Sequence, residues 1–233
     1  MQLFYAPDIK DEYYVLGTED SRHCVKVMRL KEGDKITLTD GLGHFYYAEI
    51  EEPDIRAAKV KIRRKEFIEK YWPYRLHIAM APTKNMNRTE WALEKMTELG
   101  VDAFTPLLCE HSERKVIKPA RMERIVTAAV KQSLKPWFPK LEGIDQFRQF
   151  VERDFKGEKY IAYIDENYNQ LMKGLYPAGS DAVIMIGPEG DFSSGEVELA
   201  LEKGFEPVSL GSSRLRTETA AVTACHTIHV LNQ

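Results

Sequence analysis

Two glycine-containing segments near the end of the chain have residue types suited to holding a ligand. The first, from Gly187 to Ser193, reads Gly-Pro-Glu-Gly-Asp-Phe-Ser, and the second, from Leu210 to Ala220, reads Leu-Gly-Ser-Ser-Arg-Leu-Arg-Thr-Glu-Thr-Ala. Glycine leaves no side chain where a flat ligand must lie against the backbone, and proline stiffens the turn. The two segments predict a rigid cradle whose peptide groups can form hydrogen bonds with a ligand.

The charged side chains of the second segment add possible chemistry. The guanidinium of Arg216 can stabilise a developing anion, and the carboxylate of Glu218 or, less directly, that of Glu189 can accept a proton. The alternative for Arg216 and Glu218 is an internal salt bridge, with the acid also stabilised by the positive end of a helix. The sequence favours an anion-stabilising Arg216 and leaves the identity of the base open.

Each segment is expected at the end of a strand. Apolar runs at 182–186 and 207–210 precede the two segments, and each segment leads into a helical pattern. Ser193 and Glu196 have the spacing of a capping box, which predicts a helix that continues to about residue 203. Ligands of open α/β sheets bind at the carboxyl ends of strands. One glycine turn alone would indicate only a well-capped turn, whereas two such segments together indicate a site.

Strand and helix patterns alternate from residue 75 to the end, which predicts a largely parallel α/β sheet. The expected strands are 76–80, 101–107, 159–164, 182–186 and 207–210. The expected helices are 89–99, 119–133, 193–203 and 217–231. Residues 134–159 are expected to form one long connection.

The first 70 residues have a different pattern, in which short β-like runs alternate with turns and one helical stretch at 19–28. The runs are 2–5, 35–39, 45–50 and 59–62, and Asp40-Gly41 marks a tight turn. This pattern predicts a small β-barrel. The segment 67–74, which contains Trp72-Pro73, is the expected linker.

Composition limits the classes of function. The chain has 233 residues and a formal net charge of −3. Its first residues lack the basic and apolar regions of a signal peptide, and no apolar run approaches the ~20 residues of a membrane helix. These features predict a cytoplasmic protein with no membrane partner. Cys24, Cys109 and Cys225 are too widely spaced for a disulfide framework or a metal pair, and His226 and His229 are expected to pack within the last helix, so no metal site is predicted.

An acidic average charge does not exclude an RNA partner, because local basic surfaces neutralise phosphates. Two clusters are candidates, although each can also be an ordinary solvated face. The first comprises Arg56, Lys59, Lys61, Arg63, Arg64 and Lys65, and the second comprises Arg114, Lys115, Lys118, Arg121, Arg124, Lys131, Lys135 and Lys140. Together they favour RNA binding.

The two glycine-containing segments also carry a resemblance. Gly-Pro-Glu-Gly-x-Phe-Ser followed by Leu-Gly-x-x-x-Leu-Arg-Thr-Glu-Thr-Ala resembles the signature of the RsmE-type methyltransferases of the SPOUT superfamily, which modify uracil N3 in small-subunit (16S) ribosomal RNA. The similarity extends to 88–100, 105–107, 22–30 and Asp40-Gly41, and therefore covers nearly the whole chain.

The resemblance implies an α/β fold with a PUA-like β-barrel for RNA binding at 1–70 and a SPOUT catalytic domain at 71–233, with a trefoil knot at about 180–225. It also implies a homodimer that acts on 16S rRNA within the small ribosomal subunit, with S-adenosylmethionine as the cofactor. The implied cofactor-binding residues are Ile186, Gly187, Pro188, Glu189, Gly190, Leu210, Gly211, Leu215 and Thr217. The implied catalytic residues are Arg216 and Glu218, and the implied RNA-binding residues are Arg22, Arg29, Arg88 and Arg214.

The sequence departs from the family pattern at three places. Asp191 stands where a second glycine is usual, Ser213-Arg214 replaces a common Arg-Ile pair, and 83–87 lacks a glycine often found before the following helix. We expect Arg214 to supply the charge of the usual arginine. Two other functions stay open, namely ribose 2′-O-methylation of tRNA or rRNA by the same superfamily and non-catalytic RNA binding.

Overall fold

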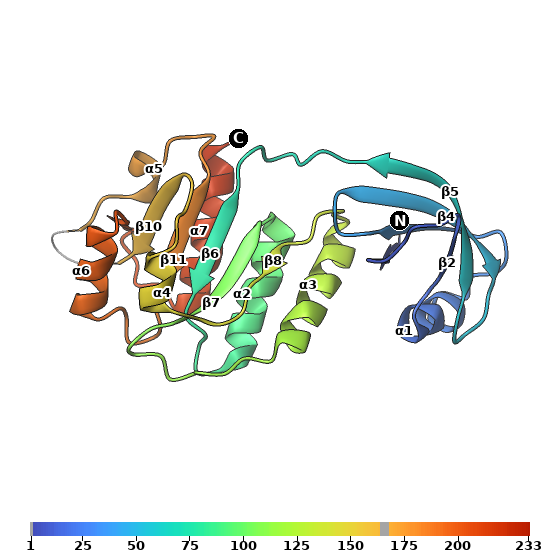
Figure 1. Cartoon of the computed structure of the whole chain (residues 1–233), viewed down its shortest axis with the longest axis horizontal. Helices are drawn as coiled ribbons and strands as arrows, with labels where there is room; N and C mark the ends of the chain where they lie inside the picture. The colour runs from blue at the N-terminus through green and yellow to red at the C-terminus, as the bar shows by residue number, and fades with distance from the viewer. Residues whose placement is uncertain (1, 164–167) are drawn as a thin grey trace. The chain divides into compact units, whose positions relative to one another are not determined.

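The computed structural model describes residues 2–163 and 168–233, and the chain divides into two compact units (Figure 1). The first unit comprises Met1–Tyr71 and Val130–Phe138, and the second comprises Trp72–Ala129 and Pro139–Gln233. The return of 130–138 to the first unit had no signal in the sequence. Within the described residues, no helix combines the length and the apolar character needed to cross a bilayer.

The first unit is built on a five-stranded sheet with the order β1-β3-β4-β5-β2. The strands are β1 (Leu3–Tyr5), β2 (Tyr13–Val15), β3 (Lys35–Thr39), β4 (His44–Glu52) and β5 (Lys59–Phe67). Only β1 and β3 are parallel, and the other pairs are antiparallel. The helical stretch divides into α1 (Thr18–Arg22) and a π-helical turn, η1 (His23–Val27). Alternate strand residues such as Leu38, Ile50 and Val60 form one buried core, as the period of a strand requires.

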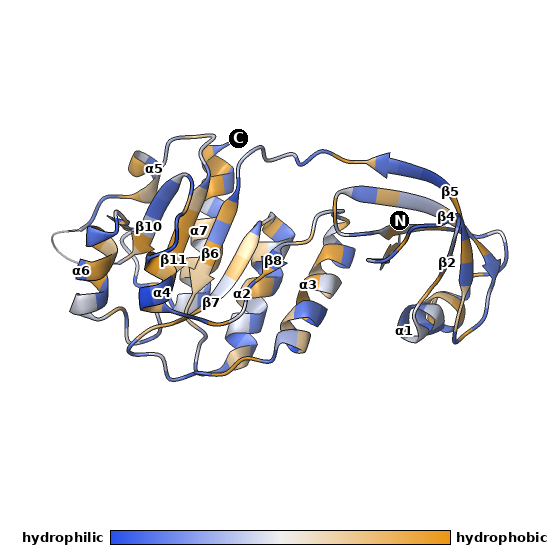
Figure 2. Cartoon of the chain, viewed as in Figure 1, coloured by the Kyte–Doolittle hydropathy of each residue, from blue (hydrophilic) through white to orange (hydrophobic). Residues whose placement is uncertain are grey.

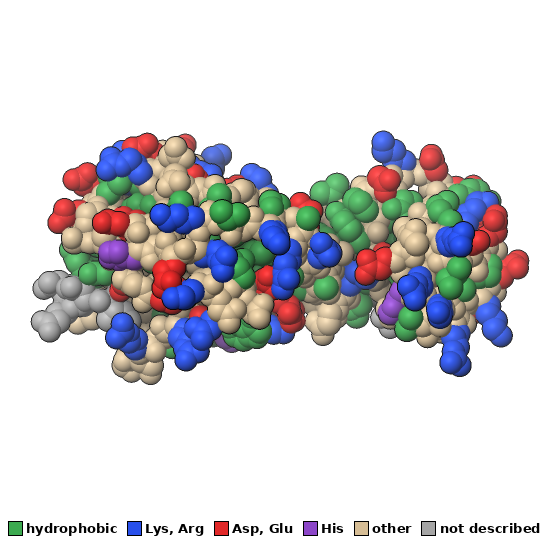
Figure 3. All heavy atoms as spheres, turned by 90° about the horizontal axis from the view of Figure 1, so that it is seen from below, with side chains coloured by type: hydrophobic (Ala, Val, Ile, Leu, Met, Phe, Trp, Pro, Cys, Tyr) green, Lys and Arg blue, Asp and Glu red, His purple; other side chains and the backbone are tan. Residues whose placement is uncertain are grey.

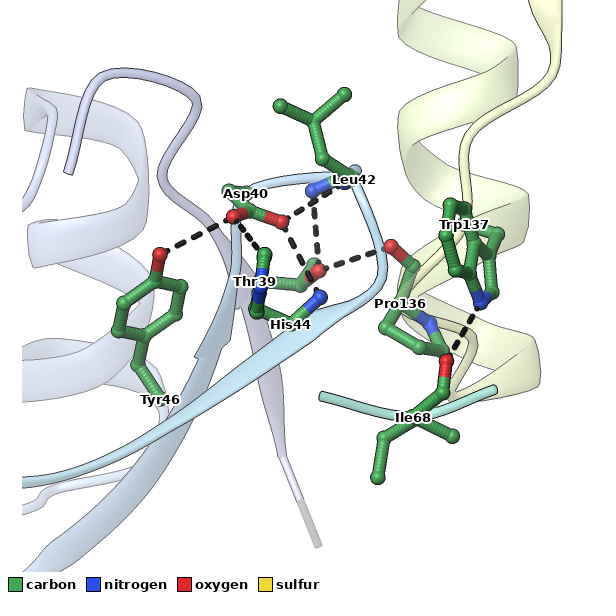
Figure 4. A network of polar contacts seen from close by, with 9 residues as sticks. Thr39, Asp40, Leu42, His44, Tyr46, Ile68, Pro136 and Trp137 are labelled. Carbon is green, nitrogen blue, oxygen red and sulfur yellow. Dashed lines mark hydrogen bonds and ion pairs between the residues drawn. The ribbon is translucent and has the colours of Figure 1, made fainter. Parts of the chain in front are cut away.

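A polar network holds the turn after β3 and binds the segment at 136–138 (Figure 4). The carboxylate of Asp40 accepts hydrogen bonds from the backbone of Leu42, from Nδ1 of His44 at 2.7 Å and from the hydroxyl of Tyr46 at 3.1 Å. Burial favours the neutral acid, but these donors outweigh it and hold the pKa of Asp40 below its usual value. The ring of Trp137 lies so close to Gly43 that a Cβ there would be 2.3 Å from it.

The second unit contains a sheet in which every pair of neighbouring strands is parallel. Its order is β12-β10-β11-β6-β7-β8, and β9 also pairs with β7. The strands are β6 (Leu76–Met80), β7 (Ala103–Leu108), β8 (Lys140–Leu141), β9 (Asp145–Gln146), β10 (Glu158–Ala162), β11 (Ala182–Ile186) and β12 (Glu206–Val208). The predicted parallel α/β sheet is confirmed.

Helices alternate with the strands along the chain. They are α2 (Met86–Leu99), α3 (Pro119–Ser133), α4 (Phe147–Val151), α5 (Met172–Leu175), α6 (Ser194–Glu202) and α7 (Thr217–Leu231). Helices α2 and α7 pack together, with α7 against β6 and β11, and α4 packs against α6. Every residue of β11 is buried, as a strand covered on both faces requires. Hydrophobic and hydrophilic residues alternate along α2 and α3 (Figure 2), in agreement with helices that bury one side only.

The structure corrects several element predictions. The connection at 134–159 contains β8, β9 and α4, because strands of two residues are too short to show a period in the sequence. The strand β2 and the short helix α5 were not predicted. Strand β12 ends at Val208 rather than at 210, since Ser209 already pairs with Leu171 outside the strand. Residue 164, the last of one predicted strand, lies outside the described residues.

The Asp40 network predicts a pH-dependent contribution to stability. A carboxylate whose pKa is lowered by folding stabilises the protein above its unfolded pKa, and this contribution disappears as the pH falls through the folded pKa. We expect Asp40→Asn to lower the free energy of unfolding by about 1–3 kcal/mol at pH 7, with the difference vanishing in strongly acidic solution. Urea denaturation of both proteins over a pH series checks this; a difference that is the same at every pH would contradict it.

Candidate functional site

The register of the sheet brings the two glycine-containing segments to one edge. Strand β10 lies between β12 and β11, and Ala162 at its end pairs with Ile186 of β11 and with Val208 of β12. Because the three strands are parallel, their carboxyl ends coincide. The first segment begins directly after Ile186 and the second begins just after Val208, so both emerge beside the end of β10.

A cavity of about 670 Å³ lies between the two segments. Most of the residues predicted for the site contribute to its wall. These are Ile186, Gly187, Pro188, Glu189, Leu210, Gly211, Leu215 and Thr217 from the predicted cofactor set, together with Arg88, Arg214 and Arg216. The volume is within the range of small-molecule sites.

Four predicted residues do not line this cavity. Gly190 faces the side chain of His111, and a Cβ on Gly190 would be 3.1 Å from that of His111. Glu218 is only 7 % exposed and lies in the first turn of α7. Arg22 ends helix α1, and Arg29 has a positive φ of 59° in the loop that follows η1; both belong to the first unit.

Glu218 forms an ion pair with Arg88. Its Oε1 lies 3.7 Å from Nε of Arg88, in the first turn of α2, and its buried Oε2 has no hydrogen-bond partner among the described residues. The salt bridge considered for Arg216 and Glu218 is therefore replaced by a pair between Glu218 and Arg88. Arg216 is exposed in the cavity wall, and no ion pair joins it to another described residue.

The sequence did not single out seven further residues of the wall. They are Ala162, Tyr163, Asp191, Val208, Ser212, Ser213 and Ala220. Ala162 and Tyr163 line the cavity because β10 lies between the two loop-bearing strands, and the strand order has no signal in the sequence. Asp191, Ser212, Ser213 and Ala220 fall within the predicted segments, and Val208 ends the strand that precedes the second one, so the segments themselves were the signal.

Side-chain hydrogen bonds, most of them from residues that do not line the cavity, hold the first loop in shape. Glu196 completes the predicted capping box with Ser193, and its second oxygen accepts the backbone N–H of Glu110 at 2.9 Å. Nδ1 of His111 lies 3.1 and 3.0 Å from the carbonyl oxygens of Gly190 and Asp191, so this nitrogen carries the proton. Oε1 of Glu189 accepts the N–H of Lys84. The loop is therefore fixed from its outer side.

Asp191 occupies a glycine position for a conformational reason. Its φ is +63°, which is the left-handed region that favours glycine and that aspartate tolerates better than most residues. Its Oδ1 accepts the N–H of Phe192 at 2.8 Å. Partial desolvation raises the pKa of Asp191 above its usual value. This hydrogen bond and the positive charge of Arg214 both lower the pKa, but the desolvation outweighs them.

The second loop depends on a glycine and a serine. Gly211 has a φ of +132°, where a residue with a Cβ is strained. The hydroxyl of Ser209 lies 3.3 Å from the N–H of Gly211, and the backbone of Ser209 bonds with Gln170 and Met172. These contacts fix the start of the loop, which then runs to the N-terminus of α7 at Thr217.

The predicted basic cluster on β5 and the arginines of the cavity wall differ in how many of their charges are paired. In the cluster on β5, Lys59, Lys61, Arg63 and Arg64 all form ion pairs with glutamates, which favours the interpretation as a solvated face. Figure 3 shows positive and negative side chains interspersed on the face that it draws. By contrast, three arginines line the cavity and only Arg88 has an ion pair within the described part of the chain.

The surroundings of Cys109 and His229 indicate structural rather than catalytic roles. Burial raises the pKa of the Cys109 thiol, which keeps it protonated and unsuited to nucleophilic catalysis. Nδ1 of His229 is hydrogen-bonded to the hydroxyl of Tyr74. Among the residues that the structure describes, no group of histidine, cysteine and acidic side chains could hold a metal ion.

Comparison with known proteins agrees with this architecture. Residues 70–229 match the family model of an RNA methyltransferase domain, and residues 16–63 match that of an RNA methyltransferase PUA domain. The ribosomal RNA small subunit methyltransferase E of Synechocystis sp. is 33 % identical over 99 % of this chain and 77 % of its own length.

Solved structures are similar over both units. A probable rRNA-methyltransferase from Porphyromonas gingivalis is 45 % identical with a TM-score of 0.94, and the match covers 100 % of this chain and 98 % of the other. A ribosomal RNA small subunit methyltransferase E from Neisseria gonorrhoeae, bound to S-adenosyl methionine, is 29 % identical with a TM-score of 0.87 over the same shares of the two chains. The chain therefore belongs to the ribosomal RNA small subunit methyltransferase E family, with a PUA domain and an RNA methyltransferase domain.

Proposed function

We propose that this protein methylates N3 of a specific uridine in small-subunit (16S) ribosomal RNA, with S-adenosylmethionine as the methyl donor. One observation carries the proposal. A cavity lined by both glycine-containing segments lies at the carboxyl ends of β10, β11 and β12, and Arg88, Arg214 and Arg216 contribute to its wall. This combination suits an uncharged purine nucleoside beside an anionic RNA.

The residues of the cavity fit the cofactor. The N–H and C=O groups of the two loops can bond an adenine edge and a ribose, Ile186 and Leu215 supply apolar walls, and the conformation of Gly211 leaves the backbone accessible. The volume of about 670 Å³ suits a ligand of this size. When bound there, S-adenosylmethionine supplies an electrophilic methyl group and no metal is needed.

The protein's part in the reaction is to orient the base and stabilise charge. Uracil N3 carries a proton and becomes a good nucleophile only when that proton leaves, so negative charge develops on the neighbouring oxygens. We assign Arg216 to this charge, because it lines the cavity and is not engaged in an ion pair with another described residue. Arg88 and Arg214 at the cavity, and Arg22 and Arg29 of the first unit, are the proposed RNA contacts.

The proposal extends to the architecture. Residues 1–70 serve as the RNA-positioning domain and 71–233 as the catalytic domain. Residues 180–225 form a trefoil knot, which is supported by β11 lying between β10 and β6 while α7 returns to pack against β6 and β11. The protein acts as a cytoplasmic homodimer with α7 near the interface. This position of α7 is consistent with the apolar side chain of Val230, which is 49 % exposed near the end of that helix.

Mass spectrometry of nucleosides from small-subunit rRNA tests the function. Cells that lack the protein should lose N3-methyluridine, and cells in which it is restored should regain it. A change in a ribose 2′-O-methylated nucleoside instead would support ribose methylation, and no change in either would support non-catalytic RNA binding. Both results would contradict the proposal.

The role of Arg216 predicts a specific loss of turnover. We expect Arg216→Ala to lower kcat roughly 100-fold at saturating RNA, the cost that is typical of removing one donor from a site of developing charge. Arg214→Ala is the matched control, for which we expect a higher KM for RNA with most of kcat retained. Steady-state methylation of small-subunit rRNA measures both variants; near-normal kcat in Arg216→Ala would refute the assignment.

The conformation of Gly211 predicts a loss of cofactor affinity. A Cβ at φ +132° forces the loop to move or costs about 1–3 kcal/mol, so we expect Gly211→Ala to weaken S-adenosylmethionine binding roughly tenfold or more. Gly195→Ala is the control, because this glycine lies in α6 with no atom near its would-be Cβ. Calorimetric titration of both variants checks this; equal affinities would contradict it.

A further inference from the structure

The pair formed by Arg88 and Glu218 joins the first turns of two helices that pack side by side. Arg88 lies in the first turn of α2 and Glu218 in the first turn of α7, and both helices are labelled in Figure 1. Arg88 reaches the cavity wall, whereas Glu218 does not. The carboxylate therefore lies behind the arginine as seen from the cavity.

The position of Arg88 is electrostatically unfavourable without a partner. The N-terminus of a helix carries partial positive charge, and the first turn of α2 contains no acidic residue to offset it. Arg214 and Arg216 add two further positive charges to the same cavity wall, and the wall residues Glu189 and Asp191 form no ion pair with Arg88 within the described part of the chain. A long, flexible arginine side chain in this place would turn toward solvent unless a negative charge held it.

Glu218 supplies that charge from a buried position. It is 7 % exposed, its Oε1 lies 3.7 Å from Nε of Arg88, and its Oε2 has no hydrogen-bond partner among the described residues. A buried carboxylate with so few partners is costly to keep. The pair leaves the two Nη atoms of Arg88 without a hydrogen bond to another described residue, while its side chain remains 38 % exposed at the cavity.

We propose that Glu218 is a positioning residue that holds the guanidinium of Arg88 in the cavity wall, where its Nη atoms bind an oxyanion of the substrates. This inference rests on the proposed function and refines it, because it removes Glu218 from the candidates for the base. The shared ligand chemistry is a planar or tetrahedral oxyanion, which a guanidinium binds through two parallel hydrogen bonds. Its two possible sources are the carboxylate of S-adenosylmethionine and a phosphate of the RNA.

Binding measurements with three ligands distinguish the two sources of the oxyanion from each other and from a general loss of structure. Calorimetry of the full-length protein measures the affinity for S-adenosylmethionine and for 5′-methylthioadenosine, which has the same nucleoside but lacks the carboxylate. Filter binding of a small-subunit rRNA fragment over a salt series measures phosphate contacts. The variants are Arg88→Ala, Glu218→Gln and the double variant, and Glu90→Gln is the control, because Glu90 on the same helix pairs with Arg121 and does not line the cavity.

Each source predicts a distinct result. If the oxyanion is the carboxylate, S-adenosylmethionine binding weakens about 10- to 100-fold in Arg88→Ala and less in Glu218→Gln, with unchanged binding of methylthioadenosine. If it is a phosphate, RNA binding weakens and the slope of log affinity against log salt becomes shallower by about 0.7–0.9. In either case the double variant loses no more than Arg88→Ala alone, because Glu218 acts through Arg88. Glu90→Gln binds all three ligands as the native protein does.

Three binding results would overturn the inference, and so would one result from the pH profile. The first is that both single variants bind S-adenosylmethionine and RNA with native affinity. The second is that binding of S-adenosylmethionine and of methylthioadenosine weakens equally, without a change in the salt slope of RNA binding. The third is that the losses of affinity in the two single variants add up in the double variant. Loss of the acidic limb from the pH profile of kcat in Glu218→Gln would instead identify Glu218 as the base. Native protein that binds neither S-adenosylmethionine nor RNA would contradict the proposed function itself.

Discussion

The hydrogen bonds that hold the loop after β11 from its outer side are the interactions on which the site depends. A loop that offers its peptide groups to a ligand cannot use the same groups to hold itself in shape. Here Glu196 and His111 bond the loop to the segment at 109–112, and Glu189 bonds it to Lys84. The inner side of the loop remains available, and the loop contributes Gly187, Pro188, Glu189 and Asp191 to the wall of the cavity.

This arrangement determines how charge is distributed. The walls beside the strand ends contain glycines and apolar residues, which suit a nucleoside, together with Glu189 and Asp191, while the arginines come from the helix starts and from the second loop. Glu218, which is buried in the first turn of α7, offsets part of that positive charge without lining the cavity. Binding of the cofactor and recognition of an anionic RNA are thus assigned to different parts of one cavity, and neither requires a metal ligand.

Local chemistry made much of the fold predictable. The apolar run at 182–186, the capping box of Ser193 and Glu196 and the helix at 217–231 all appear where the sequence predicted them. The family resemblance correctly indicated an RNA methyltransferase with a PUA domain. The contribution of Tyr163 and the partner of Glu218 could not be predicted, because they depend on strand order and helix packing, which bring together residues far apart in the sequence. The two-residue strands between 134 and 159 were missed because they have no periodicity.

The central claim is that peptide groups of both loops bind the cofactor, and hydrogen–deuterium exchange tests it most directly. The exchange of backbone amides is followed in the native protein with and without saturating S-adenosylmethionine. The account predicts slower exchange at 187–190 and at 210–215, with little change in the strands of the first unit. Protection that is confined to another part of the chain, or protection of one loop only, would contradict it.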